Sequence, residues 1–72
     1  MLEGTVKWFN DEKGYGFIRP KQGDNDIFVH MTDVRKSGYD TLYKRDIVEF
    51  EIEEDYLGRE RAYNIVAYEP IK

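Results

Sequence analysis

Two stretches of this sequence decide its fold: Lys13-Gly14-Tyr15-Gly16-Phe17-Ile18 and, further along, Asp26-Ile27-Phe28-Val29-His30. Successive side chains of a β-strand point to opposite faces. The aromatic side chains of each stretch therefore share one face, and the aliphatic ones share the other. The rings expected on one face are Tyr15, Phe17, Phe28 and His30. If the two strands pair, one side of the sheet is aliphatic and the other is a cluster of rings.

The aliphatic face is sufficient to build a core, which leaves the rings available for another role. Its members are Ile18, Ile27 and Val29. Proteins stack unpaired nucleotide bases on ring-bearing strands that have lysines beside them. Exposed clusters of rings generally mark binding sites, and the glycines on both sides of Tyr15 leave room for a ligand. The pattern therefore favours a nucleic-acid-binding surface over a second core.

Composition excludes several classes of function. The chain has 72 residues, which we interpret as a single domain spanning 1–72, with no cysteine and one histidine. Disulfides, thiolate metal sites and cysteine nucleophiles are excluded, and a metal site built on a single histidine is disfavoured. No serine or carboxylate stands at a spacing that would orient His30 for catalysis, and no Gly-rich phosphate loop is present. The sequence predicts a binding protein without a metal or cofactor, and not an enzyme.

The net charge of −4 at first argues against a polyanionic partner. The charge is unevenly distributed, however. Residues 1–45 carry eight Lys/Arg and seven Asp/Glu, whereas residues 46–72 carry three and eight. Between Lys7 and Lys21 there are four basic and two acidic residues. The ring-bearing region is thus locally basic, and local charge decides whether a nucleic-acid strand can dock.

Alternation and turn residues predict five short strands. A turn with Gly14 separates the first two, and a long connection from residue 31 to residue 45, with one possible helical turn at Thr32-Asp33-Val34, follows the third. This order predicts an all-β chain folded as a small closed barrel, in which closure removes exposed strand edges. The expected strands cover residues 2–10, 15–20, 26–30, the alternating segment around 48–53, and about 60–68.

The pattern alone leaves two possible positions or roles for several side chains. Strict alternation places Trp8 inside with Val6, whereas a bulge near Phe9 would turn it onto the ring face. Lys7 and Lys13 are either ordinary solvated lysines or phosphate contacts beside the rings. The two loop tyrosines, Tyr39 and Tyr43, would either fold over the barrel or extend the ring surface.

The two opening stretches, together with Gly4-Thr5-Val6-Lys7-Trp8-Phe9-Asn10, resemble the signature of bacterial cold-shock proteins. The resemblance continues more loosely to Ala62-Tyr63-Asn64-Ile65 and covers essentially the whole chain. It implies an oligonucleotide-binding (OB) barrel of five antiparallel strands. It also implies binding of single-stranded RNA and DNA with little sequence selectivity, melting of weak RNA structure, and effects on transcription and translation in a stress response.

Carried onto matching positions, the resemblance turns Trp8 outward and assigns eight residues to the nucleic-acid face: Lys7, Trp8, Lys13, Tyr15, Phe17, Phe28, His30 and Tyr39. It assigns the core to Val6, Ile18, Ile27, Val29, Val48, Phe50 and Ile52. Met31 stands where the family usually has a stacking phenylalanine, and methionine still offers a soft apolar surface to a base. We also include Arg59, near the last hairpin, as a phosphate contact.

The remaining expectations concern surroundings. No basic segment followed by an apolar run begins the chain, and no stretch approaches the roughly 18 apolar residues of a membrane span. We therefore expect a cytoplasmic monomer with no membrane partner. A peptide-binding small β-barrel is the alternative, because aromatic grooves also receive proline-rich segments. The lysines beside the rings count against that alternative.

Overall fold

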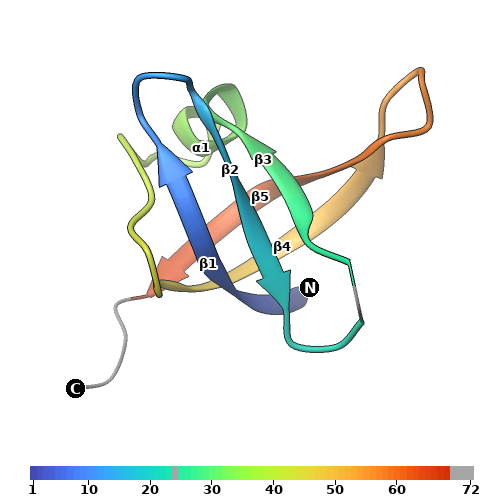
Figure 1. The fold of residues 1–72 in the computed structure, drawn as a ribbon, viewed down its shortest axis with the longest axis horizontal. Helices are drawn as coiled ribbons and strands as arrows, with labels where there is room; N and C mark the ends of the chain where they lie inside the picture. The colour runs from blue at the N-terminus through green and yellow to red at the C-terminus, as the bar shows by residue number, and fades with distance from the viewer. Residues whose placement is uncertain (24, 69–72) are drawn as a thin grey trace.

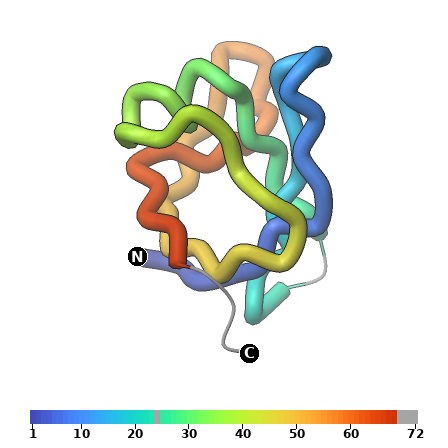
Figure 2. The backbone as a smooth tube through the Cα atoms, turned by 90° about the vertical axis from the view of Figure 1, so that its left-hand side faces the viewer, coloured from blue at the N-terminus to red at the C-terminus, as the bar shows by residue number. Residues whose placement is uncertain are grey.

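The computed structural model describes residues 1–23 and 25–68. It contains five strands and one short helix (Figure 1). In chain order these are β1 (Leu2–Asn10), β2 (Tyr15–Pro20), β3 (Ile27–His30), α1 (Met31–Lys36), β4 (Ile47–Glu54) and β5 (Glu60–Tyr68). After α1 the chain runs in one long loop to the start of β4 (Figure 2). The predicted strands are confirmed, and the helical turn expected near residue 33 is a six-residue helix.

The strands close into a barrel in the order β1-β2-β3-β5-β4, which confirms the predicted fold class. Four neighbouring pairs are antiparallel, whereas β3 and β5 pair in parallel through Phe28 and Arg61. One pair must differ, because strand directions cannot alternate all the way around a ring with an odd number of strands. The antiparallel description therefore needs this correction at the β3·β5 closure.

The core lies inside the barrel. Its buried side chains are Val6, Ile18, Ile27, Val29, Val34, Leu42, Val48, Phe50, Ala62 and Ile65. Six of the seven core positions expected from sequence are among them, while Ile52 is half-buried and packs against the cluster. Val34 of α1 and Leu42 of the long loop were not predicted. They show that the connection after β3 covers part of the barrel.

A bulge in β1 reverses the alternation at Trp8. Val6 pairs with Ile18, and Trp8 pairs with Phe17, which is adjacent to Ile18 in β2. Lys7, between Val6 and Trp8, is therefore an additional residue without a partner in this ladder. An extra residue shifts the side-chain parity by one. Val6 is therefore 2% exposed inside the barrel, whereas Trp8 is 37% exposed on its surface. The outward reading of Trp8 is confirmed.

A second bulge lies in β5. Glu49 pairs with Val66 and Glu51 pairs with Tyr63, so β5 has one residue more than β4 between these pairs. Asn64 has φ +50°, and its side chain donates a hydrogen bond to the Glu51 carboxylate at 3.1 Å. The extra residue explains how Ala62 and Ile65, three positions apart, both face the core.

Gly16 permits the close approach of β1 and β2. A Cβ atom at this position would lie 2.8 Å from Cα of Phe9, and it would also collide with the backbone carbonyl of Trp8. Real Cβ atoms essentially never come within 3.0 Å of such neighbours. The glycine therefore lets the strand that carries Trp8 lie directly against the strand that carries Tyr15 and Phe17.

Candidate nucleic-acid interface

Five aromatic side chains form one continuous group on the outer surface of β1, β2 and β3. We call this group, Trp8, Tyr15, Phe17, Phe28 and His30, the ring cluster. Six pairs of its members have ring centroids 5.3 to 6.5 Å apart. The pairs are tilted or edge-to-face, the arrangement that aromatic rings prefer. Tyr15, Phe17 and Phe28 each take part in three of the pairs, and Phe28 is the one that links His30 to the other rings.

Strand register explains why the rings meet. Tyr15 is directly opposite His30 and Phe17 is directly opposite Phe28 in the β2·β3 ladder. Directly opposite residues of an antiparallel pair lie on the same face, with Cβ atoms about 4.5–5.5 Å apart. The bulge in β1 then adds Trp8, whose ring lies 5.5 Å from that of Tyr15 and 5.3 Å from that of Phe17. The structure thus brings together the four rings that the pattern placed on this face and Trp8, which the resemblance added.

His30 has a second role as the N-terminal cap of α1. Its Nδ1 accepts a hydrogen bond from the backbone N–H of Thr32 at 3.1 Å and lies 3.0 Å from the hydroxyl oxygen of Thr32. Because Nδ1 is the acceptor, the proton of the neutral ring lies on Nε2. The cap orients the exposed ring, whose centroid is 6.3 Å from that of Phe28.

A pocket of about 430 Å³ opens beside the ring cluster. Three members of the cluster form its aromatic side, and the β4–β5 hairpin provides charged side chains opposite them. The lining residues are Phe17, Phe28, His30, Asp55, Arg59, Glu60 and Arg61. Arg59, expected near the ligand, is therefore beside the rings. Arg61, the second residue of β5, was not predicted.

Arg59 is held within its own hairpin. Its Nε donates to Oδ2 of Asp55 at 2.9 Å, and Oδ1 of Asp55 accepts the backbone N–H groups of Leu57 and Arg59 at 2.8 and 2.9 Å. These contacts, led by the Arg59 backbone hydrogen bond, lower the pKa of Asp55 below its ordinary value of 3.8. The charged carboxylate therefore organises this turn.

This arrangement predicts a local acid transition in the hairpin. A depressed pKa in the folded state contributes stability above the unfolded pKa, and this contribution is lost as pH falls through the folded pKa. Below pH 3.8 we expect the Leu57 and Arg59 amide resonances to move together in an NMR titration. In the Asp55→Asn variant the shared movement should disappear. Its persistence in that variant would show that another group controls the turn.

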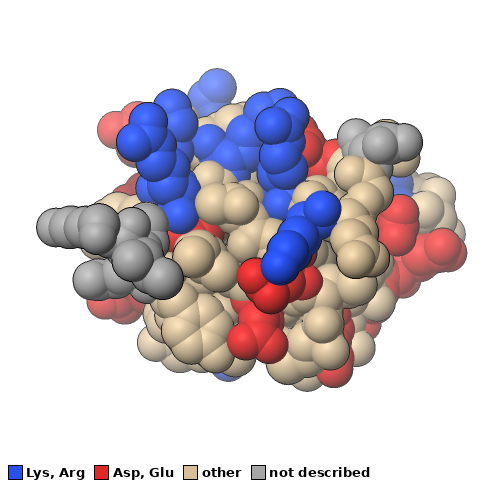
Figure 3. Space-filling model, turned by 90° about the horizontal axis from the view of Figure 1, so that it is seen from below, with Lys and Arg blue, Asp and Glu red and all other residues tan. Residues whose placement is uncertain are grey.

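The basic residues near the rings are partly paired. Nζ of Lys7 lies 2.8 Å from Oδ2 of Asp26, and Nε of Arg19 lies 4.0 Å from the other oxygen of Asp26. The ion pair of Lys21 with Glu3, 3.9 Å long, lies at the same end of the barrel. Figure 3, seen from this end, shows Lys and Arg side chains gathered along its upper edge. Such exposed pairs are weak, so a phosphate can compete for these cations.

Besides Lys7 and Arg59, three more of the expected site residues lie outside the ring cluster. Met31 begins α1 and packs against the core, with its backbone N–H donating to the Gly14 carbonyl. Tyr39 also packs against the core, and its hydroxyl oxygen accepts the backbone N–H of Ala67 at 3.0 Å. Lys13 is exposed in the β1–β2 turn, where its backbone N–H donates to the Asn10 side chain. Of the two positions that the pattern left open for Tyr39, the structure therefore has the one in which the side chain folds over the barrel.

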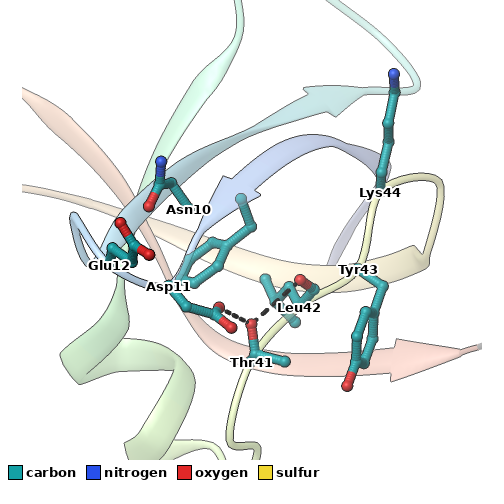
Figure 4. A pocket seen from close by; sticks show the side chains of 8 residues that line it. Asn10, Asp11, Glu12, Thr41, Leu42, Tyr43 and Lys44 are labelled. Carbon is teal, nitrogen blue, oxygen red and sulfur yellow. Dashed lines mark hydrogen bonds between the residues drawn. The ribbon is translucent and has the colours of Figure 1, made fainter.

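A second pocket, of about 470 Å³, lies between the β1–β2 turn and the long loop (Figure 4). Its lining includes Asp11, Glu12 and Lys44, and the Thr41 hydroxyl donates to Asp11 across it. Tyr43 lines this pocket and lies outside the ring cluster. Across residues 1–23 and 25–68, no cluster of three or more His, Asp or Glu side chains is arranged to hold a metal ion. In the same ranges, no helix is long and apolar enough to cross a membrane.

The geometry defines a class of protein: a closed five-stranded barrel with an aromatic surface and cations at its edge, suited to nucleic acid. The chain belongs to the cold-shock domain family. The model of that family, described as the 'Cold-shock' DNA-binding domain, matches residues 2–68. This family binds nucleic acids and is not enzymatic, in agreement with the prediction of binding without catalysis.

Individual relatives support the assignment. The chain is 50% identical over 64 residues to a cold shock-like protein of Aquifex aeolicus, with 89% of this chain and 90% of that protein covered. It is 56% identical over 52 residues to the probable cold shock protein A of Mycolicibacterium smegmatis, with 72% and 78% covered. It is also 46% identical over 63 residues to glycine-rich protein 2 of Nicotiana sylvestris. That match covers 88% of this chain and only 29% of the plant protein.

Proposed function

We propose that residues 1–72 act as one domain that binds single-stranded RNA and DNA by stacking unpaired bases on the ring cluster. The observation that carries this proposal is the unbroken series of ring contacts from Trp8 to His30 on the outer face of the barrel. The aliphatic side chains that alternate with the rings, Val6, Ile18, Ile27 and Val29, are buried, so the rings are not required to fill the core.

Stacking explains both the affinity and the low sequence selectivity of this mode. A base stacked on an aromatic side chain contributes about 1–3 kcal/mol as measured by alanine substitution, and every base has a π-face. The lysines and arginines at the edge guide the backbone without reading sequence. Three or four stacked bases therefore outweigh the few phosphate contacts.

This balance predicts weak salt dependence. With about two or three phosphates neutralised, the slope of log K against log salt for a seven-residue oligothymidine should be about −1.5 to −2. Trp8 provides the readout, because its exposed indole lies within the ring cluster. Titration with the single strand should quench Trp8 fluorescence strongly, and a duplex of equal length should not. Equal response to the duplex, or a slope near about −5, would contradict a mechanism dominated by stacking.

Melting of weak RNA structure follows from this preference by mass action, because a protein that binds the unpaired state alone shifts the folding equilibrium of a hairpin towards it. On this basis we propose roles as an RNA chaperone and as a regulator of transcription and translation. Both roles place the protein in the cytoplasm with its nucleic-acid ligand. A single domain with one ring cluster needs no second subunit to bind, so we propose a monomer.

A peptide-binding barrel is the second candidate, since an aromatic groove beside charged residues also suits a proline-rich segment. A proline-rich peptide titrated in parallel with the oligothymidine separates the two functions. Quenching of Trp8 fluorescence by the oligothymidine alone supports nucleic-acid binding. Quenching by the peptide alone would replace nucleic-acid binding with peptide binding as the function.

A further inference from the structure

Arg61 lies directly beside the ring cluster. It is the partner of Phe28 in the parallel β3·β5 pair that closes the barrel. Its side chain lines the pocket whose other side is formed by Phe17, Phe28 and His30. A base stacked on Phe28 would therefore have the Arg61 guanidinium next to its edge.

Two carboxylates from different elements hold this guanidinium. Oε1 of Glu53, on β4, accepts hydrogen bonds from Nε at 3.0 Å and from Nη2 at 2.6 Å. Oδ2 of Asp33, on α1, lies 3.8 Å from Nε. Asp33 is only 5% exposed, and its Oδ2 has no hydrogen-bond partner within the described part of the chain. The charge of Arg61 therefore compensates a carboxylate that the fold has buried.

The contacts with Glu53 occupy only one side of the guanidinium. They use Nε and one hydrogen of Nη2. Nη1 and the second hydrogen of Nη2 make no hydrogen bond to any residue in 1–23 or 25–68. These atoms form a pair of parallel N–H donors in a fixed geometry, which suits two neighbouring acceptors.

The charge around these two N–H donors of Arg61 disfavours a phosphate as their ligand. Glu53 and Asp33 together carry two negative charges against the single positive charge of Arg61, and both lie within 4 Å of it. The hydrogen bond to Glu53, followed by the charge of Asp33, raises the pKa of the Arg61 guanidinium above its ordinary value. A neutral acceptor suits this site better than an anion, which the two carboxylates would repel.

On the Hoogsteen edge, which an unpaired base leaves exposed, guanine is the base that offers two neighbouring neutral acceptors. Its O6 and N7 atoms lie side by side and accept both donors of an arginine fork. On that edge adenine presents one donor and one acceptor, thymine presents one acceptor beside a methyl group, and cytosine presents a donor. We propose that Arg61, positioned by Glu53 and Asp33, selects guanine for the base that stacks on Phe28. This inference deepens the proposed function and rests on it.

The test compares three seven-residue oligonucleotides: oligothymidine, and the same strand with a central guanine or a central adenine. A single purine can reach the Phe28 position in whichever register binds best, and adenine controls for the stronger stacking of purines. The wild-type protein should bind the guanine strand about 5- to 150-fold more tightly than the adenine strand, the discrimination of a bidentate contact. Trp8 fluorescence gives all three affinities.

The principal variant is Arg61→Gln combined with Asp33→Asn, which leaves no buried carboxylate uncompensated. In this variant the affinity for the guanine strand should be close to that for the adenine strand. The affinity for oligothymidine should stay within about threefold of the wild-type value. Arg59→Gln is the matched control, because Arg59 lines the same pocket but is paired with Asp55. The Arg59→Gln variant should keep the wild-type ratio of affinities for the guanine and adenine strands.

Other outcomes overturn the inference in distinguishable ways. Tight wild-type binding with equal affinity for guanine and adenine strands would remove the selectivity and leave the stacking function intact. Equal loss for all three strands in the double variant, with a salt slope smaller by about one, would identify Arg61 as a phosphate contact. Failure of the wild-type protein to bind any strand would overturn the proposed function as well.

Discussion

Replacing Phe28 by alanine should weaken binding of a seven-residue oligothymidine by about 5- to 150-fold, the loss expected for one stacked base at about 1–3 kcal/mol. Phe28 contacts three other rings of the ring cluster and borders the pocket beside Arg61. Its removal deletes one stacking surface of the ring cluster and the link between His30 and the other rings. Quenching of Trp8 fluorescence measures the change in affinity. Trp8 is kept in this variant, and its ring pairs with Tyr15 and Phe17 and not with Phe28.

Tyr43→Ala is the matched control for this prediction. Tyr43 is 68% exposed and lines the pocket on the long loop, outside the ring cluster. Its loss should change the affinity by less than about twofold, because an exposed side chain away from the interface contributes little. Equal losses in the two variants would mean that the ligand does not recognise the ring cluster in particular.

The largest expected effect on stability comes from Phe50→Ala. Phe50 is fully buried at 0% exposure and is the largest such side chain in the barrel. Truncation of a buried phenylalanine costs about 3–5 kcal/mol. A domain of 72 residues has a total unfolding free energy of about 4–11 kcal/mol. The variant should therefore be largely unfolded or unfold at much lower urea concentration, as followed by circular dichroism.

Ile52→Ala is the comparison for Phe50→Ala on the same strand. Ile52 is half-buried at the edge of the core, so its truncation removes fewer contacts and leaves a smaller cavity. We expect a clearly smaller shift of the urea midpoint. Similar shifts for both variants would contradict the placement of Phe50 at the centre of the barrel.

Much of the ring cluster could be predicted from sequence because alternation in a strand depends only on local geometry. Tyr15 and Phe17 must share a face wherever their strand lies, and so must Phe28 and His30. The resemblance to cold-shock proteins added Trp8, which alternation alone had left open. Only the bulge at Lys7 explains that position, and its cause is the pairing of β1 with β2.

Other positions could not be settled from sequence because they depend on packing. The pattern left two positions open for Tyr39, and in the structure it packs against the core and accepts a hydrogen bond from Ala67. Arg61 was not predicted, because its position beside Phe28 results from closure of the barrel between strands more than thirty residues apart. Nothing in the local sequence around Arg61 indicates that partner.

The sequence by itself determined which side chains of each strand share a face, where the turns fall, and which family the motifs resemble, since these depend on neighbours along the chain. The tertiary structure decided the outward orientation of Trp8, the parallel pairing of β3 with β5, and the placement of charged residues of the β4–β5 hairpin beside Phe28. The physical reason is that bulges, closure and ion pairs such as Asp33–Arg61 arise from contacts between distant segments, which exist only once the barrel has formed.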